Sequence, residues 1–302
     1  MNFPARRRAA TLVELLIGTV IAVLIVTLVI SNTVRYQRSG DAIIAATDLR
    51  GRLRDAVDMI SADLRASSPV GDSVLVASDT AIEFHSAIGS SVVCAILSSN
   101  RFTLPPDTLP SGRILSAWIV PPDTSDVFFL YADSSSGSVG RWHRATPVSV
   151  TSITAGAACP VGGLLSPSDL SASGRGYEIT VGLPLPVLVR RGSPVRVVRR
   201  VRYSVYRGGD GKWYLGYRRC NGACAAIQPL SGPYETRSGP PLTFRYFTAS
   251  GAPLVGRGPS AAVARVEIVA RARYSRVQRF PGMAASVSED SIVGVIALRN
   301  HL

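Results

Sequence analysis

A run of 19 largely apolar residues, Leu12 to Ile30, constrains the fold of this chain more than any other feature. Built as an α-helix at about 1.5 Å per residue, it would reach roughly 28 Å, close to the hydrocarbon thickness of a bilayer. Its one ionised side chain is Glu14, which follows soon after the arginines Arg6, Arg7 and Arg8. The run can therefore span a membrane, and the carboxylate within it needs an explanation because a charge in a span is costly.

Two explanations of Glu14 are open. The carboxylate can lie at the membrane edge, where it reaches the headgroups and is favoured by the helix N-terminus. A more specific interpretation uses the whole string from Arg6 to Gly18: three arginines, two small residues, then Thr-Leu-Val-Glu-Leu-Leu at the start of a long apolar segment. This string resembles the N-terminus of the type IV pilin and type II secretion pseudopilin superfamily.

The resemblance implies processing by a prepilin peptidase, which cuts on the cytoplasmic side and usually methylates the new N-terminus. It implies a leader of residues 1–9 that contains the three arginines, cleavage between Ala9 and Ala10, and N-methylation of Ala10. Glu14 would then be the fifth residue of the mature chain and would pair with the terminal amine of a neighbouring subunit during assembly. The family usually has Gly before the cut and Phe after it, where this chain has alanines.

An ordinary secretory signal is the main competing interpretation. It would have an apolar core of about 7 to 15 residues followed by a small-x-small cleavage site. Here the run is longer, and the residues from Ile30 to Arg38 make a poor cleavage site. The arginine cluster predicts a cytoplasmic N-terminus, so we expect a single-pass protein of the inner (cytoplasmic) membrane whose remainder is periplasmic. Arg35 and Arg38 weaken this charge asymmetry without reversing it.

The composition allows a sizeable core. The chain has 302 residues, of which 46% are hydrophobic, enough for one large or two small domains. Its formal charge is +13, and Lys212 is the only lysine among the basic residues. A high-GC genome explains this arginine bias as well as a ligand would. The net charge therefore permits contact with nucleic acid or anionic lipid without indicating it.

Four cysteines in a chain expected outside the cytoplasm are compatible with two disulfides. The simplest of the three connectivities joins Cys220 to Cys224 around a turn at Asn221-Gly222, and Cys94 to Cys159. A zinc site is the alternative. The cysteine spacing is not the two-residue kind, and the histidines are scattered at His85, His143 and His301, so we predict neither a metal nor a cofactor.

The helical pattern continues beyond Ser39-Gly40, where the helix can bend. Apolar residues recur mostly three or four apart, which predicts an amphipathic helix that ends before Pro69, at Ile44, Leu49, Leu53, Val57, Ile60 and Leu64. Residues 10–68 thus form one long predicted helix, half in the bilayer and half packed on a folded head. Such a helix is the shared spine of the pilin superfamily.

From residue 69 to 302, short β-branched and aromatic runs alternate with Gly, Pro, Ser and Asp, which predicts an antiparallel β-rich head and an α+β fold. The predicted strands are Val74–Ala77, Ala81–His85, Ser91–Leu97, Ile114–Val120, Val127–Ala132 and Tyr177–Val181. Residues 133–173 are predicted as loops with an isolated strand around Pro147 to Ile153.

The clearest predicted hairpin lies at residues 195–218. Valines and a tyrosine alternate with arginines from Val195 to Val205, and Val198 and Arg199 break the alternation. The turn at 208–211 leads into a returning strand from Lys212 to Arg218. Arginines beside aromatic residues are also typical of nucleic-acid stacking surfaces, but an exposed edge strand kept soluble by charge is the favoured interpretation.

Three further strands are predicted at Leu242–Phe247, Ala262–Arg273 and Ile292–Asn300. Their order is an aromatic strand ending in a Gly turn, an Arg-rich amphipathic strand and a terminal strand finishing Leu-Arg-Asn. It resembles the head of PilW-type minor pilins and J-type minor pseudopilins.

Catalytic motifs are absent: the sequence has no Gly-x-Ser-x-Gly, no His-Glu-x-x-His and no P-loop. Residues 256–261 fit a dinucleotide pattern but lead into a predicted strand instead of a helix. We therefore expect not an enzyme but a minor pilin or minor pseudopilin. Such a subunit primes or caps a type IV pilus or type II secretion pseudopilus, and its partners are prepilin peptidase and other pilins.

Two alternatives remain open. One is a pilus-associated adhesin or DNA-uptake pilin that binds acidic partners through the Arg-rich strand at 195–206. The other is an anchored enzyme or sensor unrelated to filaments.

Overall fold

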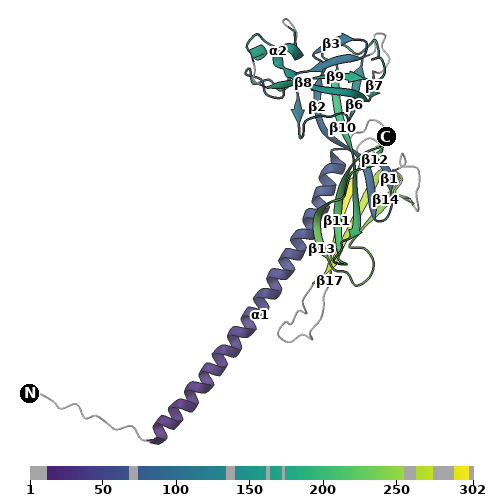
Figure 1. Ribbon diagram of the computed structural model, residues 1–302. Coiled ribbons are helices and arrows are strands. Elements are labelled where there is room, and N and C mark those ends of the chain that lie inside the picture. The colour runs from purple at the N-terminus through teal and green to yellow at the C-terminus, as the bar shows by residue number, and fades with distance from the viewer. Residues whose placement is uncertain are drawn as a thin grey trace, which may run out of the picture. The chain divides into compact units, whose positions relative to one another are not determined.

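The computed structural model describes residues 12–67, 74–133, 140–160, 164–171, 174–254, 263–274 and 289–298. One long helix, α1 (Leu12–Arg65), is followed by antiparallel β-sheets, so the protein has the α+β fold that its sequence predicts (Figure 1). The chain divides into two compact units. One consists of residues 1–51 and 273–290, and the other of residues 52–272 and 291–302.

In the first unit, α1 runs without interruption through Ser39 and Gly40, so the helix is not broken where a bend was expected. Its last residues in this unit are tied to the chain near residue 290. Arg50 donates from Nε to the carboxylate of Asp290, which also accepts a hydrogen bond of 3.1 Å from the hydroxyl of Tyr274. Ile44 was predicted on the buried face of the helix but is 62% exposed, so that assignment was wrong.

In the second unit, the end of α1 packs against strands. One face of the helix is fully buried at the spacing of an amphipathic helix, at Leu53, Ala56, Val57, Ile60 and Leu64. Gly294 of strand β17 (Glu289–Ala297) lies against this face, and a Cβ built on it would be 2.5 Å from Cγ1 of Val57. A side chain at residue 294 would therefore separate the strand from the helix.

Among the described residues, nine strands form one sheet around β10 (Pro194–Arg207). One edge of β10 pairs with β2 (Ala81–Val92); the other pairs with β6 (Val127–Ala132) at 195–198 and then with β11 (Trp213–Asn221) at 201–207. The Arg-rich strand is therefore central. The prediction of an exposed edge strand was wrong, because the periodicity of a strand does not show how many neighbours it has.

The rest of this sheet consists of shorter strands. The strands β1 (Val74–Ala77) and β5 (Ala117–Trp118) pair with β2, and β7 (Arg141–Ala145) pairs with β6. The strands β12 (Ala223–Cys224) and β13 (Gln228–Tyr234) pair with β11.

Two four-stranded sheets complete the described fold. One has the order β3 (Ala95–Ser98), β4 (Arg101–Leu104), β9 (Arg175–Val181) and β8 (Pro147–Thr154). The short helix α2 (Ala155–Ala158) and the 3-10 turn η1 (Asp169–Ser171) lie between β8 and β9 in the chain. The other has the order β15 (Pro253–Leu254), β14 (Leu242–Phe247), β16 (Arg265–Arg273) and β17.

The largest sheet and the sheet of β4 and β9 share an apolar core. Phe102 of β4 and Phe128 of β6 are both fully buried, and their rings meet edge to face at 6.2 Å between centroids. Leu104, Ile179 and Val197 belong to the same cluster. The core therefore holds β4, β6, β9 and β10 together across the two sheets.

Two disulfides lie in the second unit, Cys94–Cys159 and Cys220–Cys224, which is the simplest of the three connectivities.

Several strand predictions differ from the structure. Ile114–Val120 contains only the two residues of β5, Ser91–Leu97 is interrupted at Val93–Cys94, and β7 lies where loops were expected.

Candidate functional site

The N-terminal part of α1 is the most unusual surface of the described chain. From Leu12 to Ile30 its large apolar side chains are between 51% and 80% exposed. None of the 18 residues in its most apolar window is buried. A continuous apolar surface of this length is far larger than the patches found on soluble monomers. The helix is long and apolar enough to cross a membrane.

The hydroxyl side chains in this segment and in the turn after it are hydrogen-bonded within the helix itself. The hydroxyls of Thr19, Thr27, Ser31 and Thr33 each donate to a backbone carbonyl three or four residues earlier, at 2.8–2.9 Å. A hydroxyl bonded in this way does not require water. The segment is therefore compatible with an apolar environment despite these residues.

Glu14 lies in the first turn of α1 and is exposed. The next ionisable side chain along the helix is Arg35, so an uncharged stretch of about 30 Å separates the two residues. The predicted cleavage site at Ala9 and Ala10 and the leader arginines Arg6, Arg7 and Arg8 lie outside the described residues. The structure thus places the acid at the start of the apolar surface and leaves the leader undescribed.

Two arginines of the Arg-rich strand β10 contact a carboxylate of the neighbouring strand β2. Arg200 donates from Nε to Glu83 of β2, and a nitrogen of Arg202 lies 3.8 Å from the other oxygen of that carboxylate. Glu83 is only 2% exposed. The pairing of β2 with β10 sets Glu83 directly opposite Arg202, which a one-dimensional pattern does not reveal.

Arg199 is buried in a second cluster of charges. A register shift between β2 and β10 at Val197/Val198 accompanies the break in alternation, and the Arg199 side chain is 8% exposed. Its Nε and one terminal nitrogen lie 2.6 and 2.8 Å from the two oxygens of Asp126. A buried guanidinium paired in this bidentate way is rigidly held. Sequence analysis identified Arg199 as an irregularity but not its partner, because 73 residues separate the two.

Asp123 links the cluster to β11. It accepts hydrogen bonds from Arg219 and Ser125 and lies 3.3 Å from Arg199. Burial alone would raise the pKa of this carboxyl, but the hydrogen bonds from Ser125 and Arg219 outweigh burial and lower the pKa to about 2. Asp123 is therefore ionised under ordinary conditions.

Aromatic rings engage two further arginines of β10. The guanidinium of Arg196 lies 5.0 Å from the ring centroid of Trp142, and that of Arg207 lies 4.8 Å from Trp213. Because Arg196, Arg199 and Arg200 contact a ring or carboxylates of the same unit, the 195–206 strand has a structural role. The geometry gives no specific support to an acidic partner at this strand.

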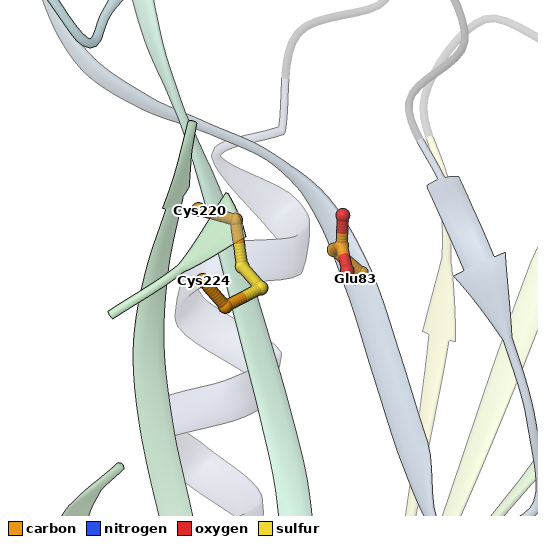
Figure 2. Close-up of side chains that lie close together, drawn as sticks. All are labelled: Glu83, Cys220 and Cys224. Carbon is orange, nitrogen blue, oxygen red and sulfur yellow. A yellow bond between two sulfur atoms is a disulfide. The ribbon is translucent and has the colours of Figure 1, made fainter. Parts of the chain in front are cut away.

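A cluster beside the disulfide Cys220–Cys224 brings together residue types that can bind metals. Figure 2 shows Glu83 next to this disulfide, and potential ligand atoms of the three residues lie within 4.8 Å of one another. The two sulfur atoms are bonded to each other and cannot also be thiolate ligands, and the carboxylate contacts two arginines. In the disulfide form these residues therefore act as a structural cluster.

Comparison with known proteins found no match among family models, curated proteins or solved structures. The functional interpretation therefore depends on the chemistry of the residues themselves.

Proposed function

We propose that this chain is a minor pilin or minor pseudopilin, a structural subunit that primes or caps a type IV pilus or type II secretion pseudopilus. It is anchored in the inner membrane by α1 with its β-rich part in the periplasm, and prepilin peptidase cuts it between Ala9 and Ala10. The observation that carries the proposal is the exposed apolar segment Leu12–Ile30 with Glu14 in its first turn. Its resemblance to prepilin N-termini supports the same assignment.

The proposed mechanism is packing of apolar helices. The exposed side chains of Leu12–Ile30 need either lipid or other helices as neighbours, and a bundle of subunits supplies the second. The helix is continuous from this segment into residues that pack against strands of the second unit, such as Val57. A subunit inserted through its helix would therefore bring a covalently attached β-rich part with it.

Glu14 supplies selectivity in this mechanism. A carboxylate and an amine about 4 Å apart attract each other by roughly 1 kcal/mol in water and about 4 kcal/mol at an effective dielectric constant near 20. The pairing is consequently weak in solvent and substantial inside an apolar bundle. Glu14 would thus favour a neighbour whose processed N-terminal amine reaches the same depth.

The size of the β-rich part supports a minor role. About 230 residues follow the predicted helix, from 69 to 302. A part of this size would crowd the shaft of a filament if every subunit carried it. A low-copy position at the start or tip of the assembly avoids that crowding.

The proposal is tested by the variants Glu14→Ala and Glu14→Gln, expressed in the host that assembles the filament. Asp41→Asn is the matched control, because Asp41 is an exposed carboxylate on the same helix outside the apolar run. We expect all three variants to insert in the membrane. We expect both Glu14 variants to be lost from the sheared filament fraction while Asp41→Asn is retained. Retention of the Glu14 variants at the level of the unmodified chain would refute the assembly role.

A further inference from the structure

The hairpin of β11 and β12 holds two cysteines opposite each other by backbone pairing as well as by their disulfide. Cys220 pairs with Cys224, and Asn221 with Ala223, in an antiparallel ladder. Gly222 forms the turn with a φ of +74°, a conformation that glycine adopts without strain. The backbone would therefore keep the two sulfur atoms close together if the disulfide were reduced.

A buried carboxylate approaches this pair from another strand. Glu83 lies on β2, two strands from β11 in the order β2, β10, β11 and β12, and its side chain reaches across β10 (Figure 2). One oxygen of Glu83 and the two sulfur atoms all lie within 4.8 Å of one another. Glu83 and Cys220 are buried, whereas Cys224 is partly exposed. Small molecules and ions can therefore reach the group from the side of Cys224.

Two arginines hold the carboxylate of Glu83 in place. Arg200 donates from Nε to one of its oxygens, and a nitrogen of Arg202 lies 3.8 Å from the other. Carboxylates that bind metals are themselves held by such outer contacts. A Zn²⁺ ion and two thiolates together carry no net charge, and neither does a disulfide. Exchanging one for the other would therefore leave the balance of charge between Glu83 and its arginines unchanged.

We propose that the reduced form of the chain binds Zn²⁺ through the thiolates of Cys220 and Cys224 and the carboxylate of Glu83, with water as the fourth ligand. Thiolate sulfur and carboxylate oxygen are both common zinc ligands, and three protein ligands with one open position are a familiar arrangement for this ion. The cysteine spacing did not predict the site, because the third ligand lies on a strand distant in the chain.

The site forms in two balanced steps. A dithiol reductant gives two electrons and two protons to the disulfide Cys220–Cys224, which becomes two thiols while the reductant becomes a disulfide. Zn²⁺ then replaces one proton on each thiol, and both protons pass to the solvent. The bound ion ties β2 to β11 and β12, a link that the disulfide within the hairpin does not make.

The test compares the disulfide and reduced forms of the full chain in detergent micelles. The chain is treated with dithiothreitol, which is then removed by desalting without oxygen, and alkylation with mass spectrometry identifies the reduced cysteines. Cys94 and Cys159 are fully buried, so we expect their disulfide to be the more resistant one. Co²⁺ serves as the probe, because its charge-transfer absorption reports thiolate ligands.

We expect the reduced chain to bind one Co²⁺, which Zn²⁺ displaces, and the disulfide form to bind it more weakly by about a hundredfold or more. Zn²⁺ should also raise the unfolding temperature of the reduced chain without changing that of the disulfide form. The reason is that an ion which binds only the folded state stabilises that state.

Three variants make the test specific. Replacing both cysteines, with Cys220→Ser and Cys224→Ser, should abolish the charge-transfer absorption, which excludes the other cysteine pair as its source. Glu83→Gln should weaken Co²⁺ binding by about tenfold or more, because one of three ligands is lost. Glu178→Gln is the matched control: Glu178 also pairs with an arginine of a neighbouring strand, Arg101, but lies outside the cluster. Circular dichroism of each variant checks that the fold is kept.

Three results would overturn the proposal. They are a reduced chain without cobalt charge-transfer absorption, equally tight binding by the disulfide form, and equal effects of Glu83→Gln and Glu178→Gln. If Glu83→Gln does not fold, the comparison of the two forms of the unmodified chain and the cysteine variant still decide. None of these outcomes depends on filament assembly.

Discussion

The hydroxyl of Tyr203 donates a hydrogen bond of 2.6 Å to Oδ2 of Asp63, which joins the central strand β10 to the end of α1. Tyr203 is 2% exposed, and its ring stacks on that of Phe84 with 6.0 Å between centroids. The contact therefore links the end of the helix to the middle of the largest sheet within the second unit.

Tyr203→Phe should lower the free energy of unfolding by about 1 to 3 kcal/mol, because it leaves a largely buried carboxylate without its donor. Tyr206→Phe is the control: Tyr206 is on the same strand, and its ring stacks on Tyr214. We expect the control to change stability by about 0.5 kcal/mol or less. Urea unfolding followed by tryptophan fluorescence measures both, and equal effects would show that the hydroxyl of Tyr203 is not special.

Asp63 should make stability depend on pH in the direction opposite to an ordinary salt-bridged acid. Burial raises the pKa of this carboxyl, and the hydrogen bond from Tyr203 offsets only part of the rise. The folded state therefore binds the proton more tightly than the unfolded state, and the contribution of this group is lost as pH rises through the folded pKa. Asp63→Asn should thus gain stability relative to the unmodified chain at pH 7, and the gain should shrink towards pH 4. A gain that grows on acidification would contradict this account.

The two disulfides should contribute unequally. Cys94 and Cys159 are 65 residues apart and Cys220 and Cys224 only 4, and a longer closed loop restricts the unfolded chain more. Replacing the first pair by alanines should cost about 4 kcal/mol and replacing the second about 2 kcal/mol. Chemical unfolding of the two double variants under oxidising conditions gives the comparison. A larger loss for the 220–224 pair would show that loop closure does not dominate.

The pair of Arg199 and Asp126 should be sensitive to removal of one charge. Asp126→Asn keeps the shape of the side chain but removes the bidentate charge partner of a buried guanidinium. Asp123, 3.3 Å away and more exposed, offsets only part of that loss, so the change should cost about 3 kcal/mol, the lower end of the range for breaking a buried pair. Glu267→Gln is the control, because its partner Arg245 is 64% exposed and such pairs contribute about 0 to 1 kcal/mol. Similar losses in the two variants would mean that the Arg199 cluster is more hydrated than its burial indicates.

Local patterns predicted much of this fold. The apolar run, the amphipathic repeat and Pro69 predicted the helix to within a few residues of its end at Arg65. The glycine-rich turn at 208–211 predicted the hairpin of β10 and β11. The structure gives Gly211 a φ of +76°, a conformation that few other residues adopt easily, which explains why the turn needs a glycine there. Both features depend on residues that are close together in sequence.

Contacts between distant residues were not predictable in this way. The burial of Arg199 requires Asp126, and the central position of β10 requires β2 on one edge and β6 and β11 on the other. The strand β7 has the sequence Arg-Trp-His-Arg-Ala, whose charged residues hide any alternation, so it was taken for a loop.

The central claim is that the chain is a processed subunit whose mature N-terminus precedes the apolar helix. N-terminal sequencing and mass analysis of the protein purified from the membranes of its own host test it most directly. The account predicts Ala10 as the first residue, with a methylated amine and without residues 1–9. A mature chain that begins at Met1, or after the apolar run beyond Ile30, would contradict it.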